Sequence, residues 1–167
     1  MLNLILNPEA VSEEEVQGFD VREAARGIVV NERGEIALLR VSRDGHYKLP
    51  GGGIDSGEDV ETAFRRECLE EIGCDVNDIT PIGIVIEYRK FLHLKQVSHC
   101  FIAKSRGVAQ PPQFTDHEIE RGFEPPIWVS IDEASRLLRE SRATTVEGRD
   151  YIVPRDCAIV EKSRTYL

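Results

Sequence analysis

Several features are missing from this sequence, and each absence excludes a class of protein. The 167-residue chain has no run of roughly 18 apolar residues, so no segment is expected to span a membrane. The short apolar stretch 2–6 has neither a basic flank nor a cleavage site, so it is not expected to be an export signal. No linker or internal repeat divides the chain, and 41% hydrophobic residues suffice for a core. We therefore expect one domain over residues 1–167.

Cysteine is scarce, and its spacing excludes two kinds of site. The four cysteines form no CxxC pair and have no histidine partners at zinc-finger distances. No signature of a Ser/His/Asp or Cys/His nucleophile occurs either. We therefore expect neither a zinc finger nor covalent catalysis, and we expect a reduced protein located in the cytoplasm.

Positive charge is also in short supply. The chain has 21 Lys and Arg against 30 Asp and Glu, which gives a formal net charge of −9. A molecule of this sign repels nucleic-acid polymers, so a negatively charged partner must be received by a local metal ion and a few basic groups. We expect a small-molecule partner, and neither a nucleic-acid polymer nor a membrane.

The most informative segment that is present is GGGIDSGEDVETAFRRECLEEIGC, residues 51–74. Seven of its residues stand at spacings that would coincide by chance on the order of once in 10⁸ starting points. They are Gly52, Glu58, Arg66, Glu67, Glu70, Glu71 and Gly73.

Part of this segment has the pattern of a helix. Residues 58–72 are good helix formers without proline, Ser56 and Asp59 can cap the start, and Gly73 supplies a stop. Apolar-type residues spaced four apart can face a core. These residues are Phe64, Cys68 and Ile72.

Three glutamates share another side of this helix. Glu67, Glu70 and Glu71 stand at i, i+3 and i+4, which places each within ~5–6 Å of a neighbour. Like charges at such spacing repel one another, and Mg²⁺ or Mn²⁺ removes the repulsion because carboxylate oxygens are its preferred ligands. Gly51 or Gly52 could add a backbone carbonyl. The cluster therefore predicts half of a metal site.

These residues resemble the Nudix box of the Nudix (MutT-like) hydrolases, G-x5-E-x7-R-E-U-x-E-E-x-G-U, over residues 52–74. All seven fixed positions match, and the two bulky apolar positions hold Cys68 and Cys74. A solvated acidic helix face without a ligand is the alternative, but it leaves Glu58, Arg66 and the glycines unexplained. The flanking segments GIVVNERGEIALLRVSRDGHYKLPGGG and IWVSIDEASRLL resemble the family more loosely.

The resemblance implies a metal-dependent pyrophosphohydrolase, in which water attacks phosphorus in a nucleoside diphosphate linked to another moiety X. Glu70 and Glu71 are the expected ligands of Mg²⁺ (or Mn²⁺), with a carbonyl from Gly51 or Gly52. Glu67 is expected to be either a third ligand or the base that takes the proton of the water.

Other residues receive supporting roles. Arg66 is expected to orient a neighbouring glutamate through a charge-assisted bond, and Glu58 has a similar structural role. A further base or ligand is expected from Glu118 or Glu120, although each could equally be an ordinary loop residue. The remaining expectations concern basic groups and histidine. Arg40 and Lys48 are expected to hold phosphates beside the close-approach loop at Gly52, whereas Arg26 and His46 are expected at the surface.

Periodicity outside the box predicts a mixed α+β chain. Strands are expected at 24–30, 35–41, 82–88, 97–103 and 127–129, helices at 132–140 and 153–162, and a long loop at 107–122. The turn at 31–34 predicts a hairpin in which Gly34 adopts positive φ. The resemblance implies the more specific architecture, an α/β/α sandwich around a mixed sheet.

Substrate choice is not fixed by the sequence. Pro81 lies too close to the box for the proline of ADP-ribose pyrophosphatases, and Tyr88 falls short of the tyrosine of dinucleoside polyphosphate hydrolases. A modified nucleoside triphosphate is the default expectation by analogy, and ADP-ribose or another nucleotide sugar is next. A non-catalytic nucleotide sensor and an isoprenyl diphosphate isomerase are further alternatives. Homodimers are common in the family, and the sequence leaves the oligomeric state undecided.

Overall fold

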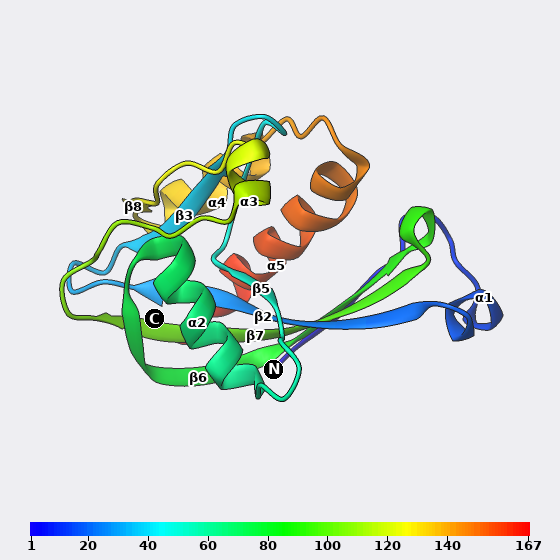
Figure 1. Ribbon diagram of the computed structural model, residues 1–167, viewed down its shortest axis with the longest axis horizontal. Helices are drawn as coiled ribbons and strands as arrows, with labels where there is room; N and C mark the ends of the chain where they lie inside the picture. Colours follow the sequence, from blue (N-terminus) through cyan, green and yellow to red (C-terminus); the bar gives the residue numbers. More distant parts are fainter.

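A computed structural model describes residues 1–167 and shows one mixed β-sheet with helices on both faces (Figure 1). The strands are β1 (Leu2–Leu6), β2 (Asp20–Val30), β3 (Ile36–Val41), β4 (His46–Lys48), β5 (Gly51–Gly53), β6 (Asp75–Arg89), β7 (Leu94–Arg106) and β8 (Ile127–Val129). The helices are α1 (Glu13–Gln17), α2 (Val60–Ile72), α3 (Asp116–Glu120), α4 (Ile131–Glu140) and α5 (Val153–Ser163), with a 3₁₀ turn at Lys90–Leu92 and a π-helical turn at Glu147–Ile152.

The sheet combines parallel and antiparallel pairs. Its main order is β1-β6-β7-β2-β3-β4, with β5 beside β2 and β8 beside β3. The pairs β1–β6 and β2–β7 are parallel, and the other pairs are antiparallel. The expected α+β class with a mixed sheet between helical layers is therefore confirmed.

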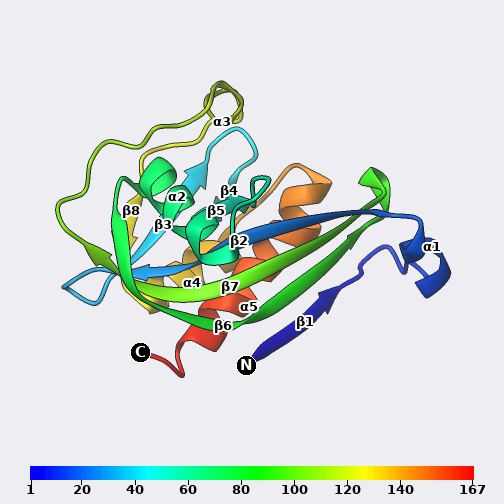
Figure 2. The same cartoon turned by 60° about the horizontal axis from the view of Figure 1, so that its bottom comes forward.

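Alternation along the strands builds two cores, one on each face of the sheet. In β3, Ala37 and Leu39 pack in the core beneath α2, whereas Ile36 and Leu38 pack in the core beneath α4 and α5. This two-residue period is what a strand buried on both faces requires. Figure 2 shows the same arrangement, with α2 on one side of the sheet and α4 and α5 on the other.

Helix α2 has the predicted core face and the predicted stop. Asp59 caps its start by accepting the amide of Thr62 at 2.8 Å, so Asp59 and not Ser56 is the cap. The helix ends at Gly73, whose φ of 67° is left-handed. The three apolar-type residues spaced four apart are fully buried under the sheet. They are Phe64, Cys68 and Ile72.

The long strands extend beyond their predicted ends. β2 begins at Asp20 because its first residues pair with β7 from Leu94 onward. β6 continues through Pro81, since register shifts on either side of it accommodate the missing N–H. Together these strands form a long arm that projects from the body of the molecule (Figure 1). Residues 2–6, for which no strand was predicted, pair in parallel with residues 83–87.

The connections are also more ordered than the sequence predicted. The predicted long loop 107–122 contains α3, which Thr115 and Glu118 hold with a reciprocal capping box. The polar stretch before α5 forms the π-helical turn Glu147–Ile152. At the turn between β2 and β3, Gly34 has the predicted positive φ, 76°. None of the helices combines the length and the apolar character that crossing a membrane requires.

Candidate active site

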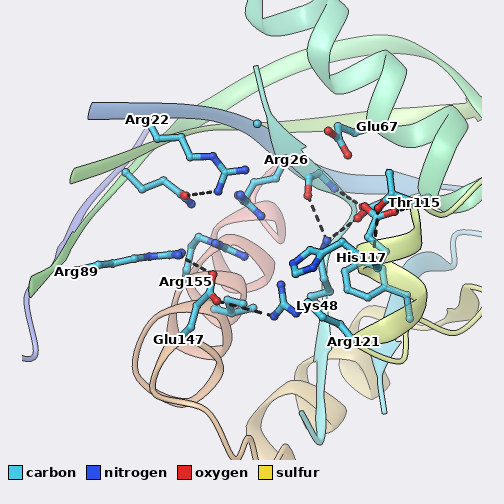
Figure 3. A pocket seen from close by; sticks show the side chains of 18 residues that line it. Arg22, Arg26, Lys48, Glu67, Arg89, Thr115, His117, Arg121, Glu147 and Arg155 are labelled. Carbon is cyan, nitrogen blue, oxygen red and sulfur yellow. Dashed lines mark hydrogen bonds and ion pairs between the residues drawn. The ribbon is translucent and has the colours of Figure 1, made fainter. Parts of the chain in front are cut away.

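A pocket of about 340 Å³ opens between the glycine strand β5, helix α2 and the α5 side of the sheet (Figure 3). Only two of its 18 lining residues are hydrophobic, so it is suited to a polar ligand. Two box glutamates, Glu67 and Glu71, face it together with Glu118. Its basic lining residues are Arg22, Arg26, Lys48, Arg89, Arg121 and Arg155.

The guanidinium of Arg66 bonds to four residues of the box. Its guanidinium binds Glu58 through two bonds of 3.0 Å, Nε to Oε1 and Nη2 to Oε2. Its Nη1 donates to Glu67 Oε1 at 2.8 Å and to Glu70 Oε2 at 3.2 Å, and Nη2 donates to the carbonyl of Gly53 at 2.8 Å. Bidentate charge-assisted bonds fix orientation as well as distance. Arg66 therefore contacts neighbouring glutamates as expected, and the roles of Arg66 and Glu58 stay predictions.

Gly52 leaves the space in which the carboxylate of Glu67 lies. A Cβ at position 52 would stand 2.4 Å from Glu67 Oε1, which is closer than atoms in contact approach. Burial raises the pKa of Glu67 to about 7, and the neighbouring charge of Glu71 adds to this effect, while Arg66 opposes it. A pKa near neutrality suits a group that has to exchange a proton.

Glu71 is buried and held by the glycine strand and Lys48. Its Oε2 accepts the amide of Gly51 at 2.7 Å, and its Oε1 accepts Lys48 Nζ at 2.7 Å. Burial raises the pKa of Glu71, while the Lys48 ammonium opposes that rise. Lys48 Nζ also donates to the carbonyl of Gly51 at 3.2 Å. Two of the predicted metal ligands, the Gly51 carbonyl and Glu71, thus share one cation in this structure, the Lys48 ammonium.

The donor set fits a hard divalent cation chemically. No three His, Cys, Asp or Glu side chains form a ready metal cage. However, Glu67 and Glu71 are both buried, repel each other and face one pocket, and the Gly51 carbonyl lies beside them. Oxygen donors of this kind suit Mg²⁺ or Mn²⁺, which take few protein ligands and complete their shell with water and substrate phosphates.

The structure separates the other predicted site residues into two groups. Glu118 lines the pocket, where its charge raises the pKa of Glu71, and its Oε2 accepts the Thr115 amide at 2.7 Å. Glu70, Glu120 and Arg40 do not line the pocket. The side chain of Glu70 is 41% exposed and binds Arg66 at 3.2 Å, while Glu120 and Arg40 are exposed.

Two expectations about surface residues are wrong. Arg26 is only 5% exposed and lines the pocket, because β2 pairs with both β7 and the glycine strand β5. His46 is 1% exposed, and its ring nitrogens have no hydrogen-bond partner. Burial lowers the pKa of His46, so its ring is neutral. It lies beneath Gly148 of the π-helical turn, where it is a packing residue.

Most of the arginines that line the pocket were not predicted as site residues, although the sequence contains a pattern for them. Arg22 and Arg26 lie four residues apart on β2, and on β6 Glu87 and Arg89 lie two apart. Residues two or four apart lie on the same face of a strand. Predicting β2 and β6 at their full length would therefore have indicated a charged patch on one face of the sheet. The β2 strand was predicted from residue 24, which excluded Arg22.

A buried ion network joins α5 to the arm and to the glycine strand. Glu87 accepts Arg89 Nη2 at 2.5 Å and Arg155 Nη1 at 3.1 Å. Asp156 then binds Arg155 Nε through Oδ1 at 2.7 Å, and its Oδ2 accepts the amide of Leu49 at 2.8 Å. Leu49 directly precedes the Pro-Gly-Gly-Gly segment, so α5 is bonded to the residue that leads into the glycine strand.

Comparisons with known proteins identify the fold and the family. A solved structure described as a NUDIX hydrolase from Nitrosomonas europaea superposes with a TM-score of 0.66 at 18% identity and covers 88% of this chain and 90% of that one. The solution structure of the E. coli ORF135 protein superposes with a TM-score of 0.63 at 17% identity and covers 89% and 92%. At these identities the likeness shows the fold alone.

Curated relatives match over about a third of this chain. A protein named RNA pyrophosphohydrolase from Wolbachia pipientis is 38% identical over 53 residues, or 31% of this chain and 33% of that protein. Another of that name from Rhodospirillum rubrum is 40% identical over 57 residues, or 34% of each. The matched part spans about a third of the length of these relatives. The model of the NUDIX domain family matches residues 20–153, from the start of β2 to the start of α5, and the chain therefore belongs to the NUDIX family.

Proposed function

We propose that this protein is a metal-dependent pyrophosphohydrolase that cleaves a phosphoanhydride bond by attack of water at phosphorus. The proposal rests on family membership and on one arrangement in the pocket. Two buried glutamates, Glu67 and Glu71, lie beside the glycine strand and face a group of basic side chains. Such a site receives a cation on one side and phosphates on the other.

Different residues of the pocket would bind the metal, accept the proton and bind the phosphates. Glu67, Glu71 and the Gly51 carbonyl would hold Mg²⁺ or Mn²⁺, which when bound neutralises phosphate charge and acidifies water. Glu67 or Glu118 accepts the proton of the attacking water, because both carboxylates face the pocket. Arg66 keeps Glu67 in place through its bond of 2.8 Å. Basic side chains of the lining bind phosphate oxygens, and those beside the reacting phosphates stabilise the charge that develops on them.

The proposed substrate is a nucleoside diphosphate linked to another moiety. A modified nucleoside triphosphate, cut to a monophosphate and pyrophosphate, remains our first choice, and ADP-ribose or another nucleotide sugar is second. The name of the curated relatives adds an RNA to the candidates, although the net charge of −9 opposes binding of a long polymer. The four cysteines are free thiols, which is compatible with the proposed cytoplasmic location.

A substrate panel with identification of the cut bond tests this proposal. The full chain is incubated with nucleoside triphosphates, ADP-ribose, nucleotide sugars and a short 5′-triphosphate RNA in Mg²⁺, in Mn²⁺ and in EDTA. Reaction in ¹⁸O-labelled water shows which phosphorus is attacked. We expect turnover of at least one compound that needs the cation and places ¹⁸O on a phosphate product. Tight binding of a nucleotide with no turnover under any condition would favour a non-catalytic sensor.

A further inference from the structure

The basic side chains that line the pocket differ in how their charge is balanced. Arg89 binds Glu87 and Glu147, and Arg155 binds Glu87 and Asp156. Arg121 and Lys48 also have carboxylate partners, at 3.0 Å from Asp44 and 2.7 Å from Glu71, respectively. Within this fold, a buried cation is therefore normally paired with an acid.

Two arginines of the pocket lack a carboxylate partner: Arg26, which is buried, and Arg22, which is exposed near the start of β2. Neither forms an ion pair, and each has one weak or neutral contact: Arg22 Nη1 with Gln96 Oε1 at 3.4 Å, and Arg26 Nε with Ser98 Oγ at 3.1 Å. The remaining guanidinium donors of Arg26 have no protein acceptor, although only 5% of the residue's surface is exposed. An unpaired buried charge is costly, so a fold retains one where a ligand completes it.

The surroundings increase this cost. Burial and the nearby charge of Arg155 lower the pKa of Arg26 to about 10, while the more distant carboxylates of Asp156 and Glu87 oppose this shift without forming an ion pair with Arg26. Despite the repulsion, Arg26 remains protonated at neutral pH, and Figure 3 shows Arg22 and Arg26 on the same side of the pocket. Two adjacent guanidinium groups with free donors match the oxygens of a phosphate better than any neutral group.

The pair lies directly beside the catalytic loop. In the β2–β5 pairing, Arg26 stands opposite Gly51. A Cβ on Gly53 would be 3.0 Å from Arg22 Nη2, so the second guanidinium lies against the other end of the same strand. An anion held here is therefore within reach of a diphosphate bound at the box, but the box glutamates are not its partners.

We propose that Arg22 and Arg26 form a second anion subsite, which binds a phosphate of the substrate other than the two that flank the scissile bond. That the bound phosphate belongs to a substrate rests on the proposed function, whereas the subsite itself rests on the two arginines. The phosphate has two sources, the next phosphate in a polyphosphate chain or a phosphate monoester on the leaving group. The preferred substrate thus carries at least one more phosphate than the reaction requires.

Binding is tested first, without metal and without turnover. Inorganic phosphate is titrated into the full chain in EDTA, and guanidinium Nε–Hε signals are followed by NMR, with chloride at equal ionic strength as the reference. We expect the Arg26 and Arg22 signals to shift and saturate in the wild type, and the Arg26 shift to weaken in Arg22→Gln. Arg33→Gln, an exposed arginine on the β2–β3 turn, serves as the matched control and should bind as the wild type does. Absence of a saturable shift at either arginine would overturn the subsite.

Turnover then distinguishes the two sources. Specificity constants are compared within two pairs that differ by one phosphate, a nucleoside triphosphate against its diphosphate and ADP-ribose 2′-phosphate against ADP-ribose. We expect a preference of about tenfold or more in at least one pair, the value of one charge-assisted contact, and its loss in Arg22→Gln but not in Arg33→Gln. Equal use within both pairs, or a preference that survives Arg22→Gln, would contradict the proposal. Phosphate binding in EDTA without turnover of any substrate would instead reject the proposed function and retain the subsite.

Discussion

Lys48 Nζ lies 2.7 Å from Glu71 Oε1, and both side chains are buried at the wall of the pocket. The ammonium compensates a carboxylate whose pKa is raised by burial. Each charge is poorly solvated and depends on the other for compensation. Removing one of them therefore lowers the free energy of unfolding.

Breaking this pair should destabilise the metal-free protein. We expect Lys48→Met to lower the free energy of unfolding by about 3–5 kcal/mol, since Glu71 is left as an uncompensated buried charge. Adding Glu71→Leu to the same chain should restore most of the loss, because it removes that charge. Urea unfolding in EDTA measures both variants. If the double variant is no more stable than Lys48→Met, the buried charge is not the cause.

Gly52→Ala should separate activity from stability. The added Cβ would lie 2.4 Å from Glu67 Oε1, and the end of that side chain can shift, but only out of the position set by Arg66. We expect a fall in kcat/KM of about 100-fold, with a thermal midpoint within a few degrees of the wild type. Gly18→Ala, where the nearest contact would be an ordinary 3.6 Å, is the control and should keep full activity.

Asp156→Ala tests whether α5 supports the glycine strand. The substitution removes the acceptor of the Leu49 amide and one partner of buried Arg155, so we expect a loss of about 3–5 kcal/mol in unfolding free energy. Asp132 forms an exposed pair with Arg164, and Asp132→Ala should cost less than about 1 kcal/mol. Equal losses in the two variants, measured by urea unfolding, would exclude a special role for Asp156.

Glu147 should contribute stability that depends on pH. Burial opposes its ionised form, but Arg89 and Arg121 outweigh burial and lower the pKa of Glu147 below 4.5. Because the folded pKa is lower than the unfolded one, the contribution is complete above that ordinary value and is lost as pH falls through the folded pKa.

The corresponding variant is Glu147→Gln. We expect it to cost about 1–2 kcal/mol of unfolding free energy near neutral pH. The difference from the wild type should shrink as pH falls below 4.5 and end below the folded pKa, where the carboxyl is neutral in both states. Urea unfolding at a series of pH values measures the difference. A cost that stays constant into acid would mean that shape, rather than charge, is the contribution of Glu147.

The sequence predicted the parts of the fold that depend on local interactions. Helix α2, its core face and its stop at Gly73 follow from spacing within one segment. The orienting contact of Arg66 with Glu67 lies within the same segment. Strand β1 and the extension of β2 to Asp20 depend instead on pairing with β6 and β7, residues far away in the sequence. Such pairing is decided by tertiary contacts that local propensity does not contain.

The arginine side of the pocket was missed for the same reason. Arg26 was expected at the surface because its strand was judged alone, whereas the β7 and β5 neighbours of β2 bury it. Arg155 comes from the last helix and meets Glu87 across 68 residues of sequence. A local pattern predicts the glutamate side of the pocket, but only the assembled sheet brings the arginine side to it.

Metal-dependent hydrolysis that relies on Glu71 is tested most simply by Mg²⁺-dependent turnover in the wild type and in Glu71→Gln. Both are measured on the best substrate of the panel. Glu71 is buried and lines the pocket, whereas the side chain of Glu70 is 41% exposed and does not line it, so Glu70→Gln is the matched neighbour. We expect Glu71→Gln to lower kcat by about 100-fold or more while the protein remains folded, with a smaller loss in Glu70→Gln. Wild-type rates in Glu71→Gln, or rates that do not change in EDTA, would contradict this expectation.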